Sequence, residues 1–299
     1  MNALQCAGRT ACFALLPAFL VTTPVQAEGV LDRVARSGVV SIGYRDSSPP
    51  FSYPDQDRRP VGYSIDICLK IVDAMRQATK RSVDVRYVPV TSATRMDAVV
   101  KGEVDLECGT TTSTSERRQK VAFTVPTYIA TTRLLVKSGS GIHSINDLAG
   151  KTVVTTRGTT AEKLFRETDT RRTLRATLLE AKDHAESFAV LQAGKADAFI
   201  MDDVLLYSLR ASSGVPEKFE VTREALNIEP LAIMFSKDDP AFKQLVDREV
   251  VRMIVENDIH RIYRRWFESP IPPKGINLGL TMSYLLRDSF KAPTDWLPN

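Results

Sequence analysis

The order of apolar and amphipathic segments repeats one pattern twice along the chain. From residue 39 to residue 108, short strand-like segments alternate with stretches whose apolar residues recur at helical spacing, and a similar series runs over 152–212. Apolar segments at 130–136 and 231–235 connect the two series, and a long helical pattern follows at 240–256. This alternation predicts an α/β fold with mostly parallel strands. Two such units joined by two crossings would form two lobes with a cleft between them.

The amino terminus has the features of a cleaved secretory signal. Arg9 gives a positive start, residues 11–21 form an apolar run too short to span a bilayer comfortably, and Val25-Gln26-Ala27 supplies the small residues that a signal peptidase needs. We therefore expect a signal peptide over 1–27, cleavage near Ala27 and a periplasmic mature protein. Prolines within the segment disfavour the alternative of a retained membrane anchor.

Two cysteines, Cys68 and Cys108, remain after cleavage in a chain that would face an oxidising compartment. One bridge between them is possible. However, Cys68 falls on the apolar stripe of a predicted helix, and Cys108 ends a predicted buried strand. Two inert buried thiols are at least as well supported, and the sequence leaves the disulfide open.

Composition excludes several classes of function. The 40 basic and 36 acidic residues are interspersed and leave a formal charge of only +4, so the chain has no electrostatic footprint for nucleic acid. The three histidines lack metal-ligand spacing, and no G-x-S-x-G elbow is present. We therefore expect a soluble exported protein that is not an enzyme and uses no metal or cofactor.

A run of hydroxyl residues marks the first candidate binding element. Residues 110–115 read T-T-T-S-T-S and are followed by Glu116-Arg117-Arg118. Short donors thus stand at the carboxyl end of a predicted strand, with a forked guanidinium about two helical turns later, where both could hold one small anion. A solvated loop followed by a surface arginine is the competing interpretation.

Further polar side chains follow the ends of other predicted strands, where ligands of open α/β sheets bind. Each has an ordinary explanation of its own, such as a helix cap for Thr159 or Asp202 and a solvated surface position for the arginines. Together they form a candidate site at the cleft: Arg45, Ser92, Arg95, Thr110, Thr112, Thr159, Thr160, His184 and Asp202.

Nine short segments, in order along the chain, carry a likeness to a known family. They are Y-R-D-S-S-P-P-F-S-Y (44–53), V-G-Y-S-I-D (61–66), T-S-A-T-R (91–95), E-C-G-T-T-T (107–112), E-R (116–117), G-T-T-A-E (158–162), A-K-D-H (181–184), M-D-D (201–203) and R-W-F-E-S-P-I-P-P-K (265–274). With these segments the chain resembles the periplasmic solute-binding proteins of polar amino acid ABC transporters, solute-binding protein family 3, and most specifically their glutamate/aspartate-binding branch.

The resemblance implies a two-lobed periplasmic binding protein fold of type II, in which each lobe is a mostly parallel sheet flanked by helices. Lobe 1 would comprise residues 28–129 and 235–299, and lobe 2 residues 130–234. Two hinge strands, near 127–133 and 229–235, would join them.

The resemblance also implies how the ligand backbone is held. Arg117 would receive the α-carboxylate as a bidentate pair, helped by Thr110 and Thr112, because a planar fork fits a carboxylate better than a lysine does. Thr159 and Thr160 would add donors at a helix start, where free N–H groups favour an anion.

The remaining roles concern the other ligand groups. Asp202 would accept the α-ammonium, and Phe51 would pack against the carbon chain, although core packing explains a lone phenylalanine equally well. Relatives that take cationic amino acids carry a carboxylate at the position of Arg45, so a guanidinium there implies an acidic ligand. Arg95 and His184 match positions that hold the distal carboxylate. Cationic groups gathered in one cleft would be neutralised by glutamate or aspartate.

The implied function is capture of glutamate or aspartate and delivery to an inner-membrane ABC permease by a monomer whose lobes close on the ligand. The alternative is a secreted dehydratase of the same fold that acts on a cyclic acid such as arogenate or prephenate. Its general acid would have to be His184 or Glu107. A receptor sensor domain is a weaker alternative, because a second membrane segment is missing from the sequence.

Overall fold

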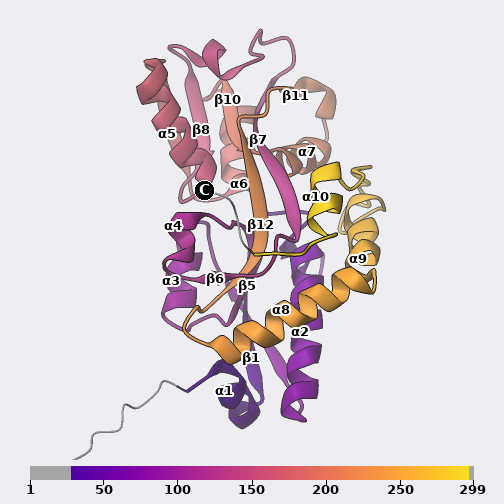
Figure 1. The fold of residues 1–299 in the computed structure, drawn as a ribbon. Helices are drawn as coiled ribbons and strands as arrows, with labels where there is room; N and C mark the ends of the chain where they lie inside the picture. The colour runs from indigo at the N-terminus through magenta and orange to yellow at the C-terminus, as the bar shows by residue number, and fades with distance from the viewer. Residues whose placement is uncertain (1–27, 296–299) are drawn as a thin grey trace, which may run out of the picture.

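The computed structural model describes residues 28–295, and its main sheet runs continuously through two lobes (Figure 1). Lobe 1 is built on parallel strands, with β1 (Val39–Tyr44) between β4 (Asp84–Pro89) and β5 (Leu106–Thr112). Its other elements are α1 (Val30–Ser37), β2 (Tyr53–Pro54), β3 (Pro60–Val61), α2 (Tyr63–Thr79), α3 (Arg95–Val100), α4 (Ser115–Arg118), β6 (Ala122–Phe123), α8 (Pro240–Val255) and α9 (Asp258–Phe267). Helix α10 (Tyr284–Ser289) contacts β7 (Tyr128–Lys137), one of the strands that join the lobes.

Lobe 2 repeats the same plan. Its strand β8 (Thr152–Thr156) lies between β10 (Ala198–Asp202) and β9 (Thr177–Ala181) and is parallel to both. The other elements are the 3₁₀ helix η1 (Ile145–Leu148), α5 (Thr160–Arg172), α6 (His184–Gln192), α7 (Asp203–Ser212), the 3₁₀ helix η2 (Pro216–Lys218) and β11 (Phe219–Val221).

Two long strands join the lobes. β7 (Tyr128–Lys137) and β12 (Asn227–Phe235) pair with each other in antiparallel fashion, from Asn227 opposite Thr132 to Leu231 opposite Tyr128. Beyond this segment β7 pairs with β10 of lobe 2, and β12 pairs with β5 of lobe 1. The predicted α/β fold of two mostly parallel units with two crossings is therefore confirmed.

Helix α2 begins where only glycine fits. Gly62 has φ +139°, and a Cβ on it would lie 2.1 Å from the carbonyl oxygen of Phe51. Along the helix the predicted apolar stripe, including Ile65, Cys68 and Val72, is buried against the sheet. The spacing of apolar residues thus determines both the helix and the face it buries.

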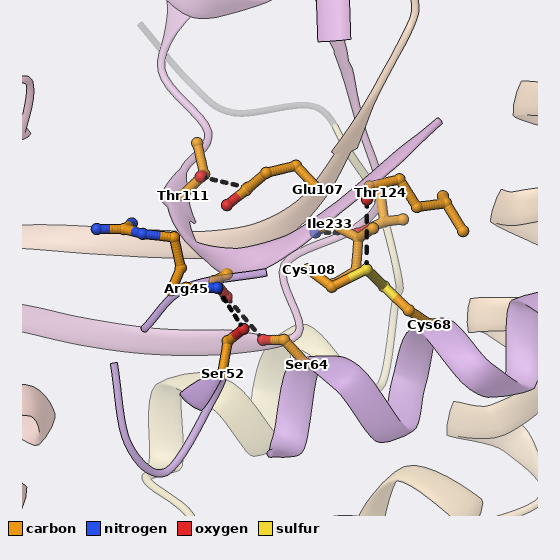
Figure 2. Close-up of a disulfide and its surroundings, with 11 residues drawn as sticks. Arg45, Ser52, Ser64, Cys68, Glu107, Cys108, Thr111, Thr124 and Ile233 are labelled. Atoms are coloured by element: carbon orange, nitrogen blue, oxygen red, sulfur yellow. Dashed lines mark hydrogen bonds between the residues drawn. A yellow bond between two sulfur atoms is a disulfide. The ribbon is translucent and has the colours of Figure 1, made fainter. Parts of the chain in front are cut away.

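A disulfide joins Cys68 of α2 to Cys108 of β5, with 6.3 Å between the two Cα atoms (Figure 2). The interpretation of the two cysteines as inert thiols is therefore wrong. Both residues are fully buried, as expected, but burial suits a thiol and a disulfide equally. Only the packing of α2 against β5 brings them together, immediately beside Glu107.

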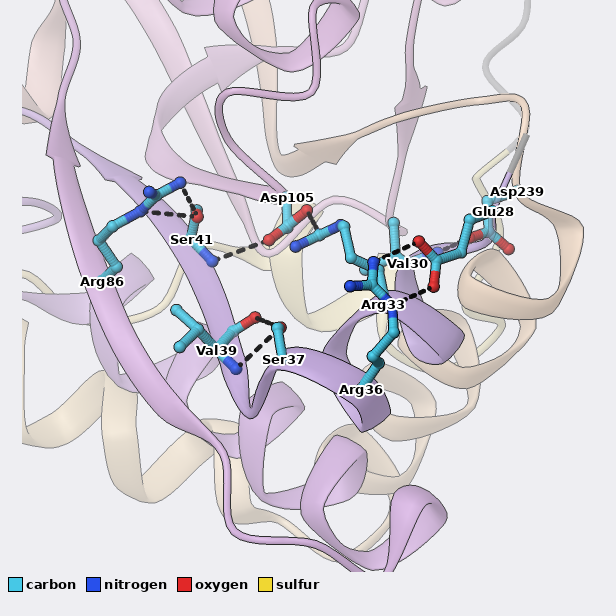
Figure 3. Close-up of polar contacts among 10 residues, drawn as sticks. All are labelled: Glu28, Val30, Arg33, Arg36, Ser37, Val39, Ser41, Arg86, Asp105 and Asp239. Atoms are coloured by element: carbon cyan, nitrogen blue, oxygen red, sulfur yellow. Dashed lines mark hydrogen bonds and ion pairs between the residues drawn. The ribbon is translucent and has the colours of Figure 1, made fainter.

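Polar contacts fasten α1 to the edge of lobe 1 (Figure 3). Arg33 forms an ion pair with the buried carboxylate of Asp105, which also accepts a hydrogen bond from the backbone N–H of Ser41 at 2.8 Å. The N–H of Val30 donates to Asp239 at 2.6 Å. The predicted signal peptide lies outside the described residues. Among those that are described, none of the helices has the length and apolar character needed to cross a bilayer.

Candidate functional site

A narrow cavity of about 180 Å³ lies where the two lobes meet. The gaps between its walls are too small to admit a water-sized sphere, so a ligand could enter only if the lobes moved apart. Its lining residues are Ser92, Arg95, Thr110, Thr112, Thr159, Thr160, His184, Met201 and Asp202. All of these except Met201 were predicted from the sequence as candidate ligand-binding residues.

The strand ends bring these side chains together. In lobe 1 they stand between β4 and α3 and along the end of β5. In lobe 2 they stand at the starts of α5 and α6 and at the end of β10. The carboxyl ends of parallel strands lie at one edge of each sheet, so residues far apart in the chain reach the same cavity.

Arg45 and Arg95 are buried guanidinium groups with incomplete hydrogen bonding. Arg45 is 1% exposed and donates from Nη2 to Ser92 Oγ at 2.7 Å, whereas its Nη1 has no hydrogen-bond partner in residues 28–295. Arg95 is 2% exposed and donates from Nη1 to the Thr110 carbonyl at 3.3 Å. Burial and the nearby Arg95 lower the pKa of Arg45 to about 9. Both groups therefore have unused donors for an anion.

Arg117 links the two lobes. Its Nη1 donates to the Thr112 carbonyl at 2.9 Å in its own lobe, and its Nη2 donates to the Gly158 carbonyl at 3.3 Å in the other lobe. Burial, followed by the proximity of Arg95, lowers the pKa of Arg117 to about 10. Arg117 lines a larger groove that shares Thr159 and Thr160 with the narrow cavity.

The two threonines at the start of α5 differ in role. Thr159 caps the helix, because its hydroxyl accepts from the N–H of Glu162 at 3.1 Å and donates to the Thr156 carbonyl at 2.7 Å. Thr160 Oγ1 lies 3.4 Å from Thr112 Oγ1 across the cleft. The ordinary cap interpretation thus accounts for the Thr159 hydroxyl, whereas Thr160 contacts lobe 1.

His184 is 1% exposed, and its Nδ1 lies 2.8 Å from Thr156 Oγ1. Its Nε2 has no hydrogen-bond partner among the described residues. Burial, and then the charges of Arg45 and Arg95, lower the pKa of His184 well below its ordinary value. His184 is therefore neutral near pH 7, and the expectation that it adds a further positive charge is not supported.

Asp202 is 1% exposed and lines the cavity from the end of β10. Its side chain makes no cap hydrogen bond to α7, and its Oδ1 has no partner within the described chain. Burial, and then the nearby Glu229 and Asp203, raise the pKa of Asp202 well above its ordinary value. A cation bound beside it would offset that desolvation and repulsion.

Two fully buried carboxylates lie at the site: Glu229 was not predicted from the sequence, and Glu107 was named only as a possible general acid of the dehydratase alternative. Glu229 of β12 accepts hydrogen bonds from Thr132, Asn227 and Thr160 at 3.0, 3.0 and 2.9 Å. Glu107 of β5 accepts from Thr111 Oγ1 at 2.6 Å. A charged residue within a predicted buried strand was the available signal for Glu107, whereas the sequence around Glu229 carries none.

Phe51 lies away from the lining of the narrow cavity. It is 1% exposed and packs in an aromatic cluster with Tyr63, Tyr128 and Phe267, whose ring centroids lie 6.0, 5.1 and 5.4 Å from its own. Core packing therefore accounts for this residue, and its contact with a ligand stays a prediction.

Direct contacts hold the lobes together around the cavity. The Cα of Gly158 approaches lobe 1 so closely that a Cβ on it would lie 2.7 Å from Ala93 Cα. At the rim of the adjoining groove, Lys163 of lobe 2 pairs with Glu116 of lobe 1 at 2.5 Å. Across residues 28–295 no group of three or more histidine, cysteine or acidic side chains is placed to hold a metal ion.

Comparisons with known proteins agree with this architecture. Residues 40–269 match the model of the bacterial extracellular solute-binding proteins, family 3. The chain is 40% identical to the L-glutamate/L-aspartate-binding protein of Pseudomonas aeruginosa over 283 residues, which cover 93% of this chain and 94% of the relative. It is 37% identical to the glutamate/aspartate import solute-binding protein of Escherichia coli over 270 residues, 90% of this chain and 89% of the relative.

A solved structure supports the fold. The cysteine-binding protein from Campylobacter jejuni superposes with a TM-score of 0.71 at 27% identity, covering 80% of this chain and 93% of that chain. The two-lobed type II architecture and the sequence matches lead to one conclusion: the chain belongs to family 3 of the bacterial extracellular solute-binding proteins.

Proposed function

We propose that this protein is a periplasmic binding protein that captures glutamate or aspartate in the interlobe cleft and delivers it to an inner-membrane ABC permease. The observation that carries the proposal is the grouping of three guanidinium groups around one narrow cavity between the lobes: Arg95 lines it, and Arg45 and Arg117 donate to its lining residues Ser92 and Thr112. Buried guanidinium donors without partners are costly, and a dicarboxylic ligand supplies acceptors for them.

Each group of an acidic amino acid has a matching group in the cleft. The α-carboxylate would lie near Arg117, between the end of β5 and the start of α5, where N–H groups are available. The α-ammonium would bind Asp202, whose Oδ1 has no partner in the described residues. The distal carboxylate would lie near Arg45 and Arg95. We keep all eleven predicted residues as candidates, with Thr159 and Phe51 supported least.

Ligand groups would be satisfied only when both lobes contact them. Thr110, Thr112 and Arg117 belong to lobe 1, and Thr160 and Asp202 belong to lobe 2. A ligand that interacts with both lobes binds the closed form better than an open one, so binding shifts a hinge equilibrium toward closure. We place the lobe boundaries at 28–129 with 235–299 and at 130–234, as the sequence predicts.

The relatives support a transport role for the chain. Those from Pseudomonas aeruginosa and Escherichia coli are named as glutamate- and aspartate-binding or import proteins, and neither is named as an enzyme. We infer that this chain is exported through a cleaved signal peptide and acts as a monomer without catalysis. The dehydratase alternative has no observation in its favour at the site.

Calorimetry tests the proposal. The mature protein, stripped of bound ligand by unfolding and refolding, is titrated with glutamate, aspartate, glutamine and arginine. We expect binding of glutamate or aspartate with a Kd of about 1 μM or lower, which corresponds to about −8 kcal/mol or more favourable. No heat with either acidic amino acid would contradict the proposal. Product detection with arogenate and prephenate tests the alternative in parallel.

A further inference from the structure

Glu107 of β5 lies beside the aliphatic part of the Arg45 side chain, next to the site. Its carboxylate is 0% exposed, and its Oε1 has no hydrogen-bond partner in residues 28–295. A Cβ added at Gly109 would lie 2.3 Å from Glu107 Oε1 and 2.9 Å from Arg45 Cγ, so the oxygen and the arginine stem pack against the same glycine. Figure 2 shows Arg45, Glu107 and Thr111 around the end of β5.

The electrostatics tie Glu107 to the side-chain end of the cleft. Burial and Arg95 lower the pKa of Arg45. Of the carboxylates that raise this pKa, Glu107 has the largest effect. Burial also lowers the pKa of Arg95, and Glu107 is again the carboxylate that raises this pKa most. Glu229 acts on Arg95 but is not among the groups that shift Arg45. Glu107 therefore opposes the effect of burial most strongly at Arg45 and Arg95, whereas at Arg117 Glu229 acts most strongly and Glu107 second.

We propose that Glu107 is a specificity-determining residue, which sets the side-chain end of the cleft at one net positive charge. Among the buried groups of this end, the two guanidinium groups of Arg45 and Arg95 and the carboxylate of Glu107 leave that single charge, because His184 is neutral and Asp46 and Asp183 are not buried. One ligand carboxylate neutralises it, whereas an uncharged amide leaves it buried and unpaired, which is costly. This inference rests on the proposed function and specifies how an acidic side chain is recognised.

Removal of the Glu107 charge should sharpen the discrimination between glutamate and glutamine. These two ligands have nearly the same shape, so their affinity ratio reports charge and not fit. In Glu107→Gln the distal carboxylate of glutamate no longer experiences repulsion from a carboxylate a few ångströms away. We expect the preference for glutamate over glutamine to rise by roughly tenfold or more, since a buried unit charge at that range interacts strongly.

A second readout is the alkaline limit of binding, which is the pH above which glutamate affinity falls. Without Glu107 the pKa of Arg45 should fall, because the carboxylate that opposes burial is gone. Glutamate affinity should then decrease from a lower pH than in the wild type. A residue that only supports the fold would leave this limit unchanged. The charged or titratable groups that face Arg45 are Asp46, Arg95, Glu107, Asp183 and His184.

The experiment measures glutamate and glutamine affinities by calorimetry, with glutamate repeated between pH 7 and 10. Glu107→Met is the second neutral variant, in case Glu107→Gln does not fold, since it needs no hydrogen bond. Thr111→Ser is the matched control: it shortens the side chain but keeps a hydroxyl that can donate to Glu107, as Thr111 does at 2.6 Å, and so keeps the charge; we expect the wild-type ratio.

The outcomes separate the two proposals. A higher glutamate preference and a lower alkaline limit in both neutral variants support the role of Glu107. An unchanged or smaller preference in a variant that still binds glutamate overturns this role alone. Failure of the wild-type protein to bind either acidic amino acid refutes the proposed function, and the role of Glu107 falls with it.

Discussion

Substitution of Gly158 by alanine should hinder closure of the lobes and thereby weaken ligand binding. Gly158 belongs to lobe 2, and its Cα rests against the backbone of Ser92 and Ala93 in lobe 1. A Cβ at Gly158 would lie 2.7, 2.8 and 2.9 Å from Ala93 Cα, Ser92 O and Ala93 N, where ordinary contact begins at 3.4 Å. Backbone atoms cannot rotate away, so the lobes would have to separate by several tenths of an ångström.

The size of the effect follows from two separate costs. The φ of +79° costs an alanine about 1–2 kcal/mol in any conformation of the lobes, and this part lowers stability only. The overlap with lobe 1 exists only in the closed form and costs about 1–3 kcal/mol, as for overpacking in a core. The ligand binds the closed form, so this second cost should weaken glutamate binding by about 5- to 150-fold.

Gly141→Ala is the matched control for this test. Gly141 has φ +74°, and no heavy atom lies within 4 Å of the position that a Cβ would take, so alanine there meets the same backbone cost without the overlap. Calorimetry with glutamate and thermal unfolding without ligand are measured for both variants. Similar losses of stability, with a loss of affinity in Gly158→Ala alone, are expected. Equal affinities in the two variants would refute the closure argument.

Three further predictions concern single groups of the described structure. Replacing Cys68 and Cys108 by alanine should lower the free energy of unfolding in urea by about 2–4 kcal/mol, because the bridge closes a loop with a sequence separation of 40. Burial lowers the pKa of Arg45 to about 9, and deprotonation of Arg45 removes the charge that would attract the ligand. Calorimetry should therefore show glutamate affinity falling as pH rises above about 9. The pKa of His184 lies well below its ordinary value, so His184 carries no charge to lose near neutral pH. The Kd for glutamate should therefore change less than about threefold between pH 6 and 8. A tenfold weakening over that interval would contradict a neutral His184.

The order of residues along the chain was enough to predict much of the site. The strand pattern located the ends of β4, β8 and β10 to within a residue, whereas β5 runs on to Thr112, beyond the predicted end at Cys108. Polar residues at these strand ends line the cavity, because parallel strands present their carboxyl ends at one edge. The two crossings were also predictable from apolar segments between the two series. β12 nevertheless begins at Asn227, earlier than the apolar run suggests, since its first residues are polar and gain their strand geometry by pairing with β7.

Only the tertiary structure decided the charge balance of the cleft. The sequence suggested a cluster of positive groups, whereas packing places Glu107 and Glu229 beside the arginines and makes His184 neutral. It also brings Cys68 against Cys108 and puts Gly158 in contact with the opposite lobe. Local sequence determines which elements form, but burial, pKa and contact depend on distances between elements that are remote in the chain.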